Sequence, residues 1–192
     1  MLLRLYRGKM TKRTDSNWIQ TYTGKQFWPL NARHEDVCIE DIAHALSLKC
    51  RFSGHTNRFY SVAQHSVMVS FLCEFPEHSL LGLLHDAAEA YLPDISSPIK
   101  PFIEGFIDTE DRLLNVIFEV FNIRSPLPDV AKEDVRQSDL VALATEKRDL
   151  LRHTSYKWGI VDNINPSILI IVPQSPEQAE RSFLYRFYEL CS

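Results

Sequence analysis

The sequence predicts a mainly α-helical domain with one or two short peripheral β-strands. Apolar residues recur at helical spacing over most of the chain, helix-start signals precede two of these stretches, and only two short segments are β-prone. With 192 residues, 45% of them hydrophobic and 24% charged, the chain can bury one sizeable core but is too short for two ordinary domains. We therefore expect one domain at residues 15–192.

Residues 1–14 are expected to form a disordered extension of that domain. The segment is basic, and its apolar run is too short for the core of a signal peptide. A transit peptide is the alternative, because five basic residues come before the first acidic one.

The first half of the domain is predicted to begin with an extended segment and continue as helices. Residues 18–30 are aromatic and β-prone, which favours a short extended segment or a hairpin. Residues 35–48 have helical spacing, and residues 50–59 form a loop. A second helix starts at Ser61, which with Gln64 has the pattern of a capping box.

The second half is predicted to hold four more helices and one strand. A proline follows the first of these helices, and a Ser-Pro-Glu-Gln start opens the last one. The predicted helices cover residues 79–91, 102–121, 129–152 and 175–190, and the predicted strand covers residues 167–172 (SILIIV). We expect this strand to pair the C-terminal part of the chain with the N-terminal part.

Composition excludes several classes of function. A net charge of −4 provides no field that would attract a nucleic-acid backbone, so no duplex nucleic acid is expected as a partner. No apolar run approaches the ~20 residues that span a bilayer, so no membrane partner is expected either. The four cysteines are scattered and form no C-x-x-C pair, which is typical of reduced thiols in a cytoplasmic protein.

The segment LLHDAAEAYLPDISSPIK, residues 83–100, places ionisable side chains in apolar surroundings. His85 and Asp86 are adjacent, and Glu89 lies one helical turn further on, beside both of them. A buried carboxylate is costly unless it is paired or coordinates a metal. We therefore predict a metal site on this helix.

Two further residues could complete the site from other helices. His65 has apolar neighbours four and seven residues later, and Asp139 lies between Val135 and Leu143 on an apolar face. Imidazole and carboxylate ligands together suit Mn²⁺, Co²⁺, Fe²⁺ or Zn²⁺. No second cluster suggests another metal, so we expect one divalent ion.

The order of these residues resembles that of the HD-domain metal-dependent phosphohydrolases. The matching pieces are SVAQHS around His65, the segment 83–100 around His85 and Asp86, and SDL around Asp139. The match covers roughly residues 51–148 and is similar to the small single-domain nucleotide hydrolases. These include bacterial deoxynucleoside 5′-monophosphatases and phage dATP triphosphohydrolases. The resemblance implies an HD-domain helical bundle.

The resemblance also implies roles for particular residues. His65, His85, Asp86 and Asp139 match the metal ligands, and Glu89 and Asp94 match the paired catalytic carboxylates. Glu89 is expected to orient the attacking water and Asp94 to serve the leaving group, an assignment that could be reversed.

Substrate contacts are expected from a loop and from a lysine. Arg51 and Phe52 match an Arg-aromatic pair of the family, so Arg51 could grip a phosphate and Phe52 could stack on a base or sugar. Lys100 matches a lysine that follows the catalytic loop. His55 lies near Arg51 and either contacts phosphate or is simply exposed.

The expected function is hydrolysis of a small-molecule nucleotide by attack of metal-activated water on the 5′-phosphate, which releases a nucleoside. A monophosphatase is favoured over a triphosphohydrolase that releases tripolyphosphate, because the chain lacks large insertions. The alternatives are a non-catalytic nucleotide or metal sensor and a structural helical domain without metal. The resemblance leaves a homo-oligomer open.

Overall fold

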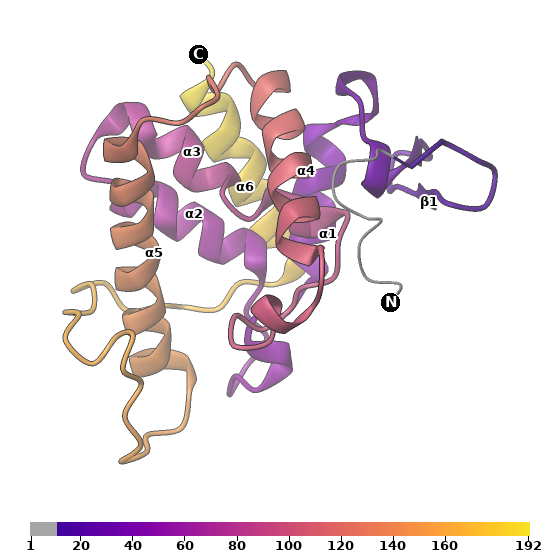
Figure 1. Cartoon of the computed structure of the whole chain (residues 1–192). Coiled ribbons are helices and arrows are strands. Elements are labelled where there is room, and N and C mark those ends of the chain that lie inside the picture. The colour runs from indigo at the N-terminus through magenta and orange to yellow at the C-terminus, as the bar shows by residue number, and fades with distance from the viewer. Residues whose placement is uncertain (1–10) are drawn as a thin grey trace.

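Six α-helices dominate the part of the chain that the computed structural model describes, residues 11–192 (Figure 1). They are α1 (Ile39–Leu48), α2 (Val62–Leu72), α3 (Ser79–Leu84), α4 (Phe106–Val120), α5 (Asp129–Leu150) and α6 (Pro176–Leu190). Within these residues the sheet consists of an antiparallel pair, β1 (Ile19–Gln20) and β2 (Gln26–Phe27). The predicted fold class, mainly α with short peripheral strands, is confirmed.

Helix α2 lies at the centre of the helical packing. It contacts α3, α5 and α6, while α1 packs on α6 and on α2 (Figure 1). The shared core includes fully buried side chains such as Ile42, Leu46, Leu83 and Phe183. Burial of each such side chain contributes about 1.5–3 kcal/mol. A polar residue on the inner face of α2 is therefore enclosed by neighbouring helices.

The hairpin predicted for residues 18–30 is confirmed and is anchored to the core. Gly24 supplies the left-handed turn (φ 85°) between the strands. Phe27 is fully buried and stacks on Tyr91 with a ring-centroid distance of 3.7 Å. The hairpin thus packs on the segment that follows α3.

The strand predicted for residues 167–172 is wrong. This segment is irregular, with a bend at Ile168 and Leu169, and pairs with no strand in the described chain, because side chains of α5 satisfy its backbone. Arg148 donates to the carbonyl oxygens of Ser167 and Leu169, and Asp149 accepts from the Ile171 N–H. The expected pairing of N- and C-terminal parts is therefore absent from residues 11–192.

The capping box predicted at Ser61 is half right. The Ser61 hydroxyl accepts the Gln64 N–H at 3.1 Å and caps α2. The Gln64 side chain does not return to Ser61. It donates to the Val172 carbonyl and accepts from the Gln174 N–H, and so holds residues 172–174 against α2.

The helix predicted for residues 79–91 is interrupted at the His-Asp pair. Helix α3 ends at Leu84, and a short 3₁₀ turn follows at Ala87–Ala90. His85 Nδ1 donates to the Gly82 carbonyl at 2.8 Å, an acceptor that a continuing helix would offer to the Asp86 N–H. The side chains of this pair therefore reach their neighbours from a turn.

The remaining helices begin or end a few residues inside their predicted ranges. Helix α6 has the predicted Ser175 N-cap, which is part of a full capping box because Ser175 and Gln178 bond to each other's backbone N–H. The other shortened helices are α1, which starts at Ile39, α4, which covers Phe106–Val120, and α5, which ends at Leu150.

The predicted extension at residues 1–14 lies largely outside the described residues. Its last four residues, 11–14, differ from the prediction because they contact the domain. Arg13 pairs with Asp36, donates to the Asn31 carbonyl and lies 4.4 Å from the Trp28 ring centroid.

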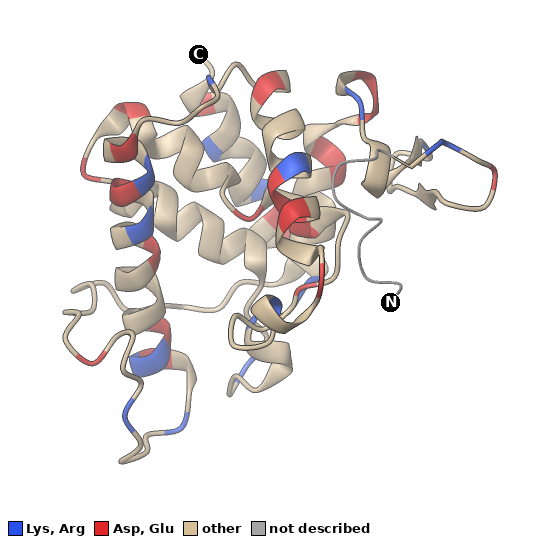
Figure 2. Cartoon of the chain, viewed as in Figure 1, with Lys and Arg blue, Asp and Glu red and all other residues tan. Residues whose placement is uncertain are grey.

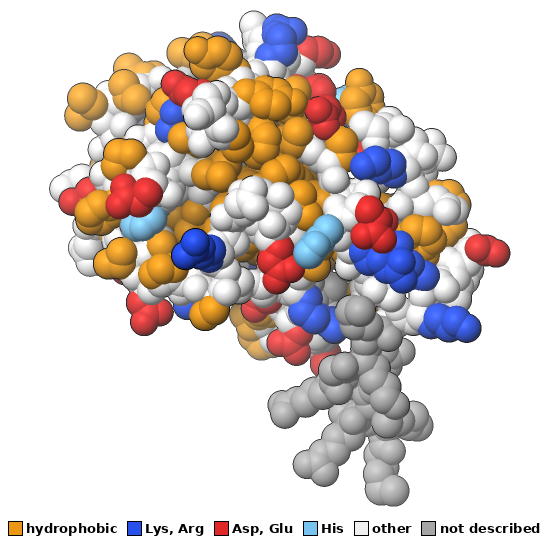
Figure 3. Space-filling view, turned by 90° about the horizontal axis from the view of Figure 1, so that it is seen from above, with side chains coloured by type: hydrophobic (Ala, Val, Ile, Leu, Met, Phe, Trp, Pro, Cys, Tyr) orange, Lys and Arg blue, Asp and Glu red, His pale blue; other side chains and the backbone are white. Residues whose placement is uncertain are grey.

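The surface of the described residues is mixed. Charged residues of both signs follow α4 and α5 (Figure 2), and the face seen in Figure 3 has hydrophobic side chains near its centre with charged ones around them. No helix among residues 11–192 is both long enough and apolar enough to span a bilayer.

Candidate metal centre

His65, His85 and Asp139 converge from three helical segments. Ser61 caps α2 and places His65 in its first turns, His85 ends α3, and Asp139 lies midway along α5. One ligand atom from each lies within 4.8 Å of the others, so this group could hold a metal ion. His65 is fully buried and the Asp139 side chain is 40% exposed. The cluster therefore has a buried floor and one open side.

Asp86 adds a fourth ligand candidate to the cluster. Its Oδ2 atom lies 3.3 Å from His85 Nε2 and 3.7 Å from His65 Nε2. The two Nε2 atoms are 3.3 Å apart, and His65 Nε2 lies 3.2 Å from Asp139 Oδ1. The structure thus brings together all four residues that the sequence suggested as ligands.

The second nitrogen of each imidazole is already used. His65 Nδ1 donates to Glu146 Oε1 at 2.7 Å, and His85 Nδ1 donates to the Gly82 carbonyl at 2.8 Å. Histidine ligands of metals are held in this way, with the other ring N–H donated to a carboxylate or carbonyl. Both Nε2 atoms are therefore oriented toward the cluster, and these residues fit a divalent cation.

Glu146 is a member of the site that the sequence analysis missed. It is fully buried, and besides His65 it accepts two hydrogen bonds from Arg51, at 3.0 and 3.2 Å. Glu146 lies seven residues after Asp139, so two helical turns place both on the same face of α5. That spacing was the available signal.

Arg51 lies where the sequence placed it, at the edge of the cluster. Its Nη1 atom is 3.7 Å from Asp86 Oδ2, and its side chain is 16% exposed. Burial opposes its charge, but Glu146 and Asp86 keep the pKa of Arg51 above its ordinary value. Arg51 is thus a fixed cation beside the ligand candidates.

The charges of the cluster stabilise one another. Burial alone would lower the pKa of His85, but the carboxylate of Asp86 outweighs it and raises that pKa to about 9. Burial alone would raise the pKa of Asp86, but His85, His65 and Arg51 hold it well below its ordinary value. The pKa of His65 is also raised, because Glu146 and Asp139 outweigh burial and the nearby Arg51.

Glu89 is the second buried carboxylate near the cluster. Burial, the Asp86 carboxylate and Asp94 together raise its pKa to about 8. Lys100 Nζ lies 3.6 Å from Glu89 Oε1 and 2.9 Å from Glu110 Oε1. Asp94 itself is exposed.

Lys49 supports this segment and was also missed. Its ammonium group donates to the backbone carbonyls of Glu89 and Leu92, which fixes the turn that presents Glu89. No sequence pattern distinguishes it from an ordinary lysine at a helix end.

The loop after α1 has a strained backbone. Phe52 and Ser53 have φ values of 55° and 50°, in the left-handed region that costs non-glycine residues ~1–2 kcal/mol each. Phe52 lies beside the Arg51 guanidinium, with its ring centroid 6.2 Å from that of Trp158. His55 is exposed, and its side chain has no hydrogen-bond partner among the described residues.

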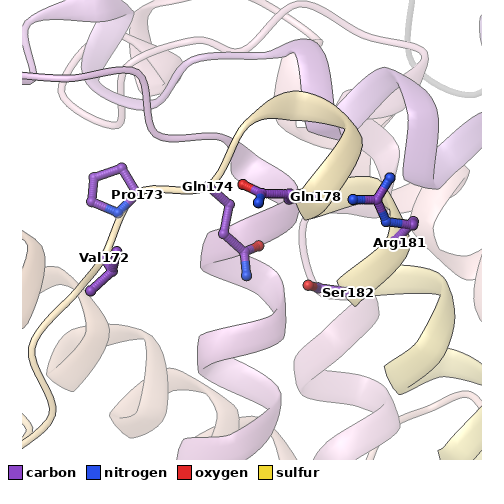
Figure 4. A pocket seen from close by; sticks show the side chains of 6 residues that line it. All are labelled: Val172, Pro173, Gln174, Gln178, Arg181 and Ser182. Carbon is purple, nitrogen blue, oxygen red and sulfur yellow. The ribbon is translucent and has the colours of Figure 1, made fainter.

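A separate hollow of about 360 Å³ lies at the start of α6. Figure 4 shows its lining, which comes from the segment before the helix and from the first turns of the helix. The lining residues are Val172, Pro173, Gln174, Gln178, Arg181 and Ser182. Because they include no histidine, cysteine or carboxylate, this hollow is not a second metal site.

The fold and the cluster define a mainly α-helical protein with a His/Asp group that could hold a metal ion. No family model matches the chain. It is 37% identical over 175 residues to the uncharacterized protein YfdR of Escherichia coli, covering 91% of this chain and 96% of that protein. It is 32% identical to the uncharacterized protein RCAP_rcc00048 of Rhodobacter capsulatus, with 90% and 95% covered. The chain belongs to the family that includes YfdR.

Proposed function

We propose that this protein is a metal-dependent phosphohydrolase of the HD-domain class that acts on nucleotides. The favoured substrates are deoxynucleoside 5′-monophosphates, which would be converted to nucleosides and phosphate.

The observation that supports this proposal is the convergence of two Nε2 atoms and two carboxylates, with each Nδ1 atom held by an acceptor. His65, His85, Asp86 and Asp139 would hold one divalent cation. Such an ion lowers the pKa of a bound water toward neutrality and polarises a phosphoryl oxygen.

Arg51 and Glu89 have the properties that phosphate-ester hydrolysis needs. Arg51 is a preorganised cation whose Nη1 atom faces the cluster, where a phosphate oxygen would lie. Glu89, with a pKa of about 8, changes protonation near neutral pH, as a general acid or base must. Lys100 balances the charge of Glu89, and the exposed Asp94 would serve the leaving-group oxygen.

The charges around the cluster favour a monophosphate over a triphosphate. The Arg and Lys side chains within 4 Å of the carboxylates of Asp86 and Glu89 in the described chain, Arg51 and Lys100, are already paired with Glu146, Glu89 and Glu110. A triphosphate would bring about four negative charges to a site with few uncommitted cations. A dNTP triphosphohydrolase that releases tripolyphosphate is the second enzymatic candidate.

The test is a substrate panel with identification of the products. The full chain, loaded with Mn²⁺, Co²⁺, Fe²⁺ or Zn²⁺, is incubated with deoxynucleoside 5′-mono- and triphosphates. We expect inorganic phosphate from the monophosphates. Tripolyphosphate from the triphosphates would favour the second candidate, and no product with any metal would refute both.

Matched variants separate catalysis from binding. Glu89→Gln should abolish turnover and leave metal affinity within a few-fold, whereas Glu133→Gln, at an exposed position of α5, should change neither. A wild-type protein that binds metal and nucleotide without releasing product would be a sensor. A protein that binds no metal would be a structural helical domain.

A further inference from the structure

A second pocket lies beside the candidate metal centre, between the end of α5 and the loop that follows it. It has a volume of about 550 Å³, within the range of small-molecule sites. Its walls come from the last turns of α5, from Leu151–Thr154 and from residues 156–166. The pocket shares no residue with the metal cluster.

The lining combines cations with aromatic rings. Four of the lining residues are basic (Lys147, Arg148, Arg152 and His153), two are aromatic (Tyr156 and Trp158), and one is acidic (Asp162). Figure 2 shows Lys and Arg residues as blue segments at the lower end of α5 and along the loop below it. In a chain of net charge −4, this is a local basic surface.

Two of the basic side chains have no partner within residues 11–192. Lys147 pairs with Asp162 at 3.2 Å, and Arg148 pairs with Asp149 at 2.6 Å. Arg152 and His153 are exposed, and their side chains make no hydrogen bond or ion pair with any other described residue. They are available to an anion that enters the pocket.

A chain of contacts joins the pocket to the metal centre. Arg51 faces Asp86, its guanidinium lies 5.4 Å from the Phe52 ring centroid, and Phe52 lies 6.2 Å from Trp158. On α5, Glu146 faces the cluster and the next residue, Lys147, faces the pocket. Arg51, Phe52 and Trp158 thus link the metal centre to the pocket that Arg152 and His153 line.

We propose that this pocket binds the base and a second phosphate group of a nucleotide whose 5′-phosphate lies at the metal centre. The proposal rests on the proposed function and narrows its substrate class to nucleotides that carry a further phosphate on the 3′ side. Trp158, which lines the pocket, supplies a stacking surface for the base, and Arg152 and His153 bind the second phosphate. Nucleoside 3′,5′-bisphosphates and 5′-phosphorylated dinucleotides both have this chemistry.

The test measures binding to the metal-loaded Glu89→Gln variant, so that the metal centre is occupied while no hydrolysis occurs. Calorimetric titrations compare deoxyadenosine 5′-monophosphate, deoxyadenosine 3′,5′-bisphosphate, a 5′-phosphorylated dinucleotide and dATP. We expect the bisphosphate to bind about tenfold more tightly than the monophosphate, a ratio typical of one added charge-assisted contact. Tighter binding of the dinucleotide than of the bisphosphate would identify an oligonucleotide end as the source of the second phosphate.

Variants assign the contacts. The double variant Arg152→Ala/His153→Ala should remove the preference for the bisphosphate and leave monophosphate binding within about twofold. Trp158→Ala should weaken both ligands by roughly five- to a hundredfold, as the loss of a stacked base does. Trp158→Phe keeps a ring and should restore most of that loss. Arg136→Ala, which removes an exposed cation of α5, should change nothing.

Several results would overturn the proposal. The proposal fails if the bisphosphate does not bind detectably, or if it binds with the same affinity as the monophosphate. It also fails if the double variant loses affinity only for dATP, or if all pocket variants bind the ligands with wild-type affinity. The two proposals fail separately. If the protein hydrolyses nucleotides but the pocket variants keep wild-type affinities, only the proposed second-phosphate site is refuted. If the bisphosphate is preferred but no nucleotide is hydrolysed, only the proposed enzymatic function is refuted.

Discussion

Replacing Glu146 with alanine should destabilise the protein strongly, because this carboxylate is fully buried and is the partner of both Arg51 and His65. It accepts two hydrogen bonds from Arg51 and one from His65. Removal of one partner of a buried ion pair costs about 3–5 kcal/mol, since the other charge is left uncompensated. For a domain of this size, that corresponds to a fall in Tm of roughly 6–20 °C.

The same change should weaken metal binding. Without Glu146 nothing holds the tautomer and ring orientation of His65, and loss of such a contact typically costs 10–100-fold in metal affinity. Glu146→Gln retains the shape and one acceptor, so both effects should be smaller.

The pH dependence follows from the pKa of Glu146. Burial opposes ionisation, but Arg51 and His65 lower this pKa below its ordinary value of 4.5. A carboxylate with a lowered folded-state pKa contributes its stability above the unfolded pKa and loses it as pH falls through the folded value. The stability difference between wild type and Glu146→Gln should therefore shrink as pH falls below about pH 4.5.

Urea and thermal unfolding measure the stability, and competition with a chromophoric chelator measures the metal affinity. Glu133→Gln, on the exposed face of the same helix, is the matched control and should behave as wild type. A Glu146→Ala variant that melts within 1–2 °C of wild type, with unchanged metal affinity, would refute the assigned role.

Three further predictions test the site and its supports. The apparent affinity for Zn²⁺ should rise by up to roughly tenfold per pH unit between pH 6.5 and 9, because the metal must displace the proton that His85 holds with a pKa of about 9. An affinity that does not change with pH in chelator competition would count against this. Ser61→Ala removes the cap of α2 and should cost about 1 kcal/mol in urea unfolding, with the exposed Ser155→Ala as a control. Ser53→Gly should stabilise the protein by about 0.5 kcal/mol, since relief of the left-handed strain exceeds the added chain entropy; a lower Tm would contradict that reasoning.

The local features of the fold could be predicted from the sequence because they depend on neighbours along the chain. Helical spacing indicated all six helices, and the N-cap predicted at Ser175 was correct. Errors arose where distant side chains compete for backbone groups. Arg148 and Asp149 form hydrogen bonds with the backbone of residues 167–172, which therefore pairs with no strand. The Gln64 side chain bonds to the backbone of Val172 and Gln174 instead of closing a capping box.

The spacing of ionisable residues on apolar faces was enough, by itself, to predict that His65, His85, Asp86 and Asp139 would meet. Each of them would be costly to bury alone, so their burial requires a shared partner. Tertiary structure alone decided the surroundings of that group. Glu146 is 95 residues from Arg51 in the chain. Only the packing of α5 on α2 and on the adjoining loop makes Glu146 a common acceptor for Arg51 and His65. The pocket at Trp158 likewise depends on a loop that folds back over α5, which no local pattern encodes.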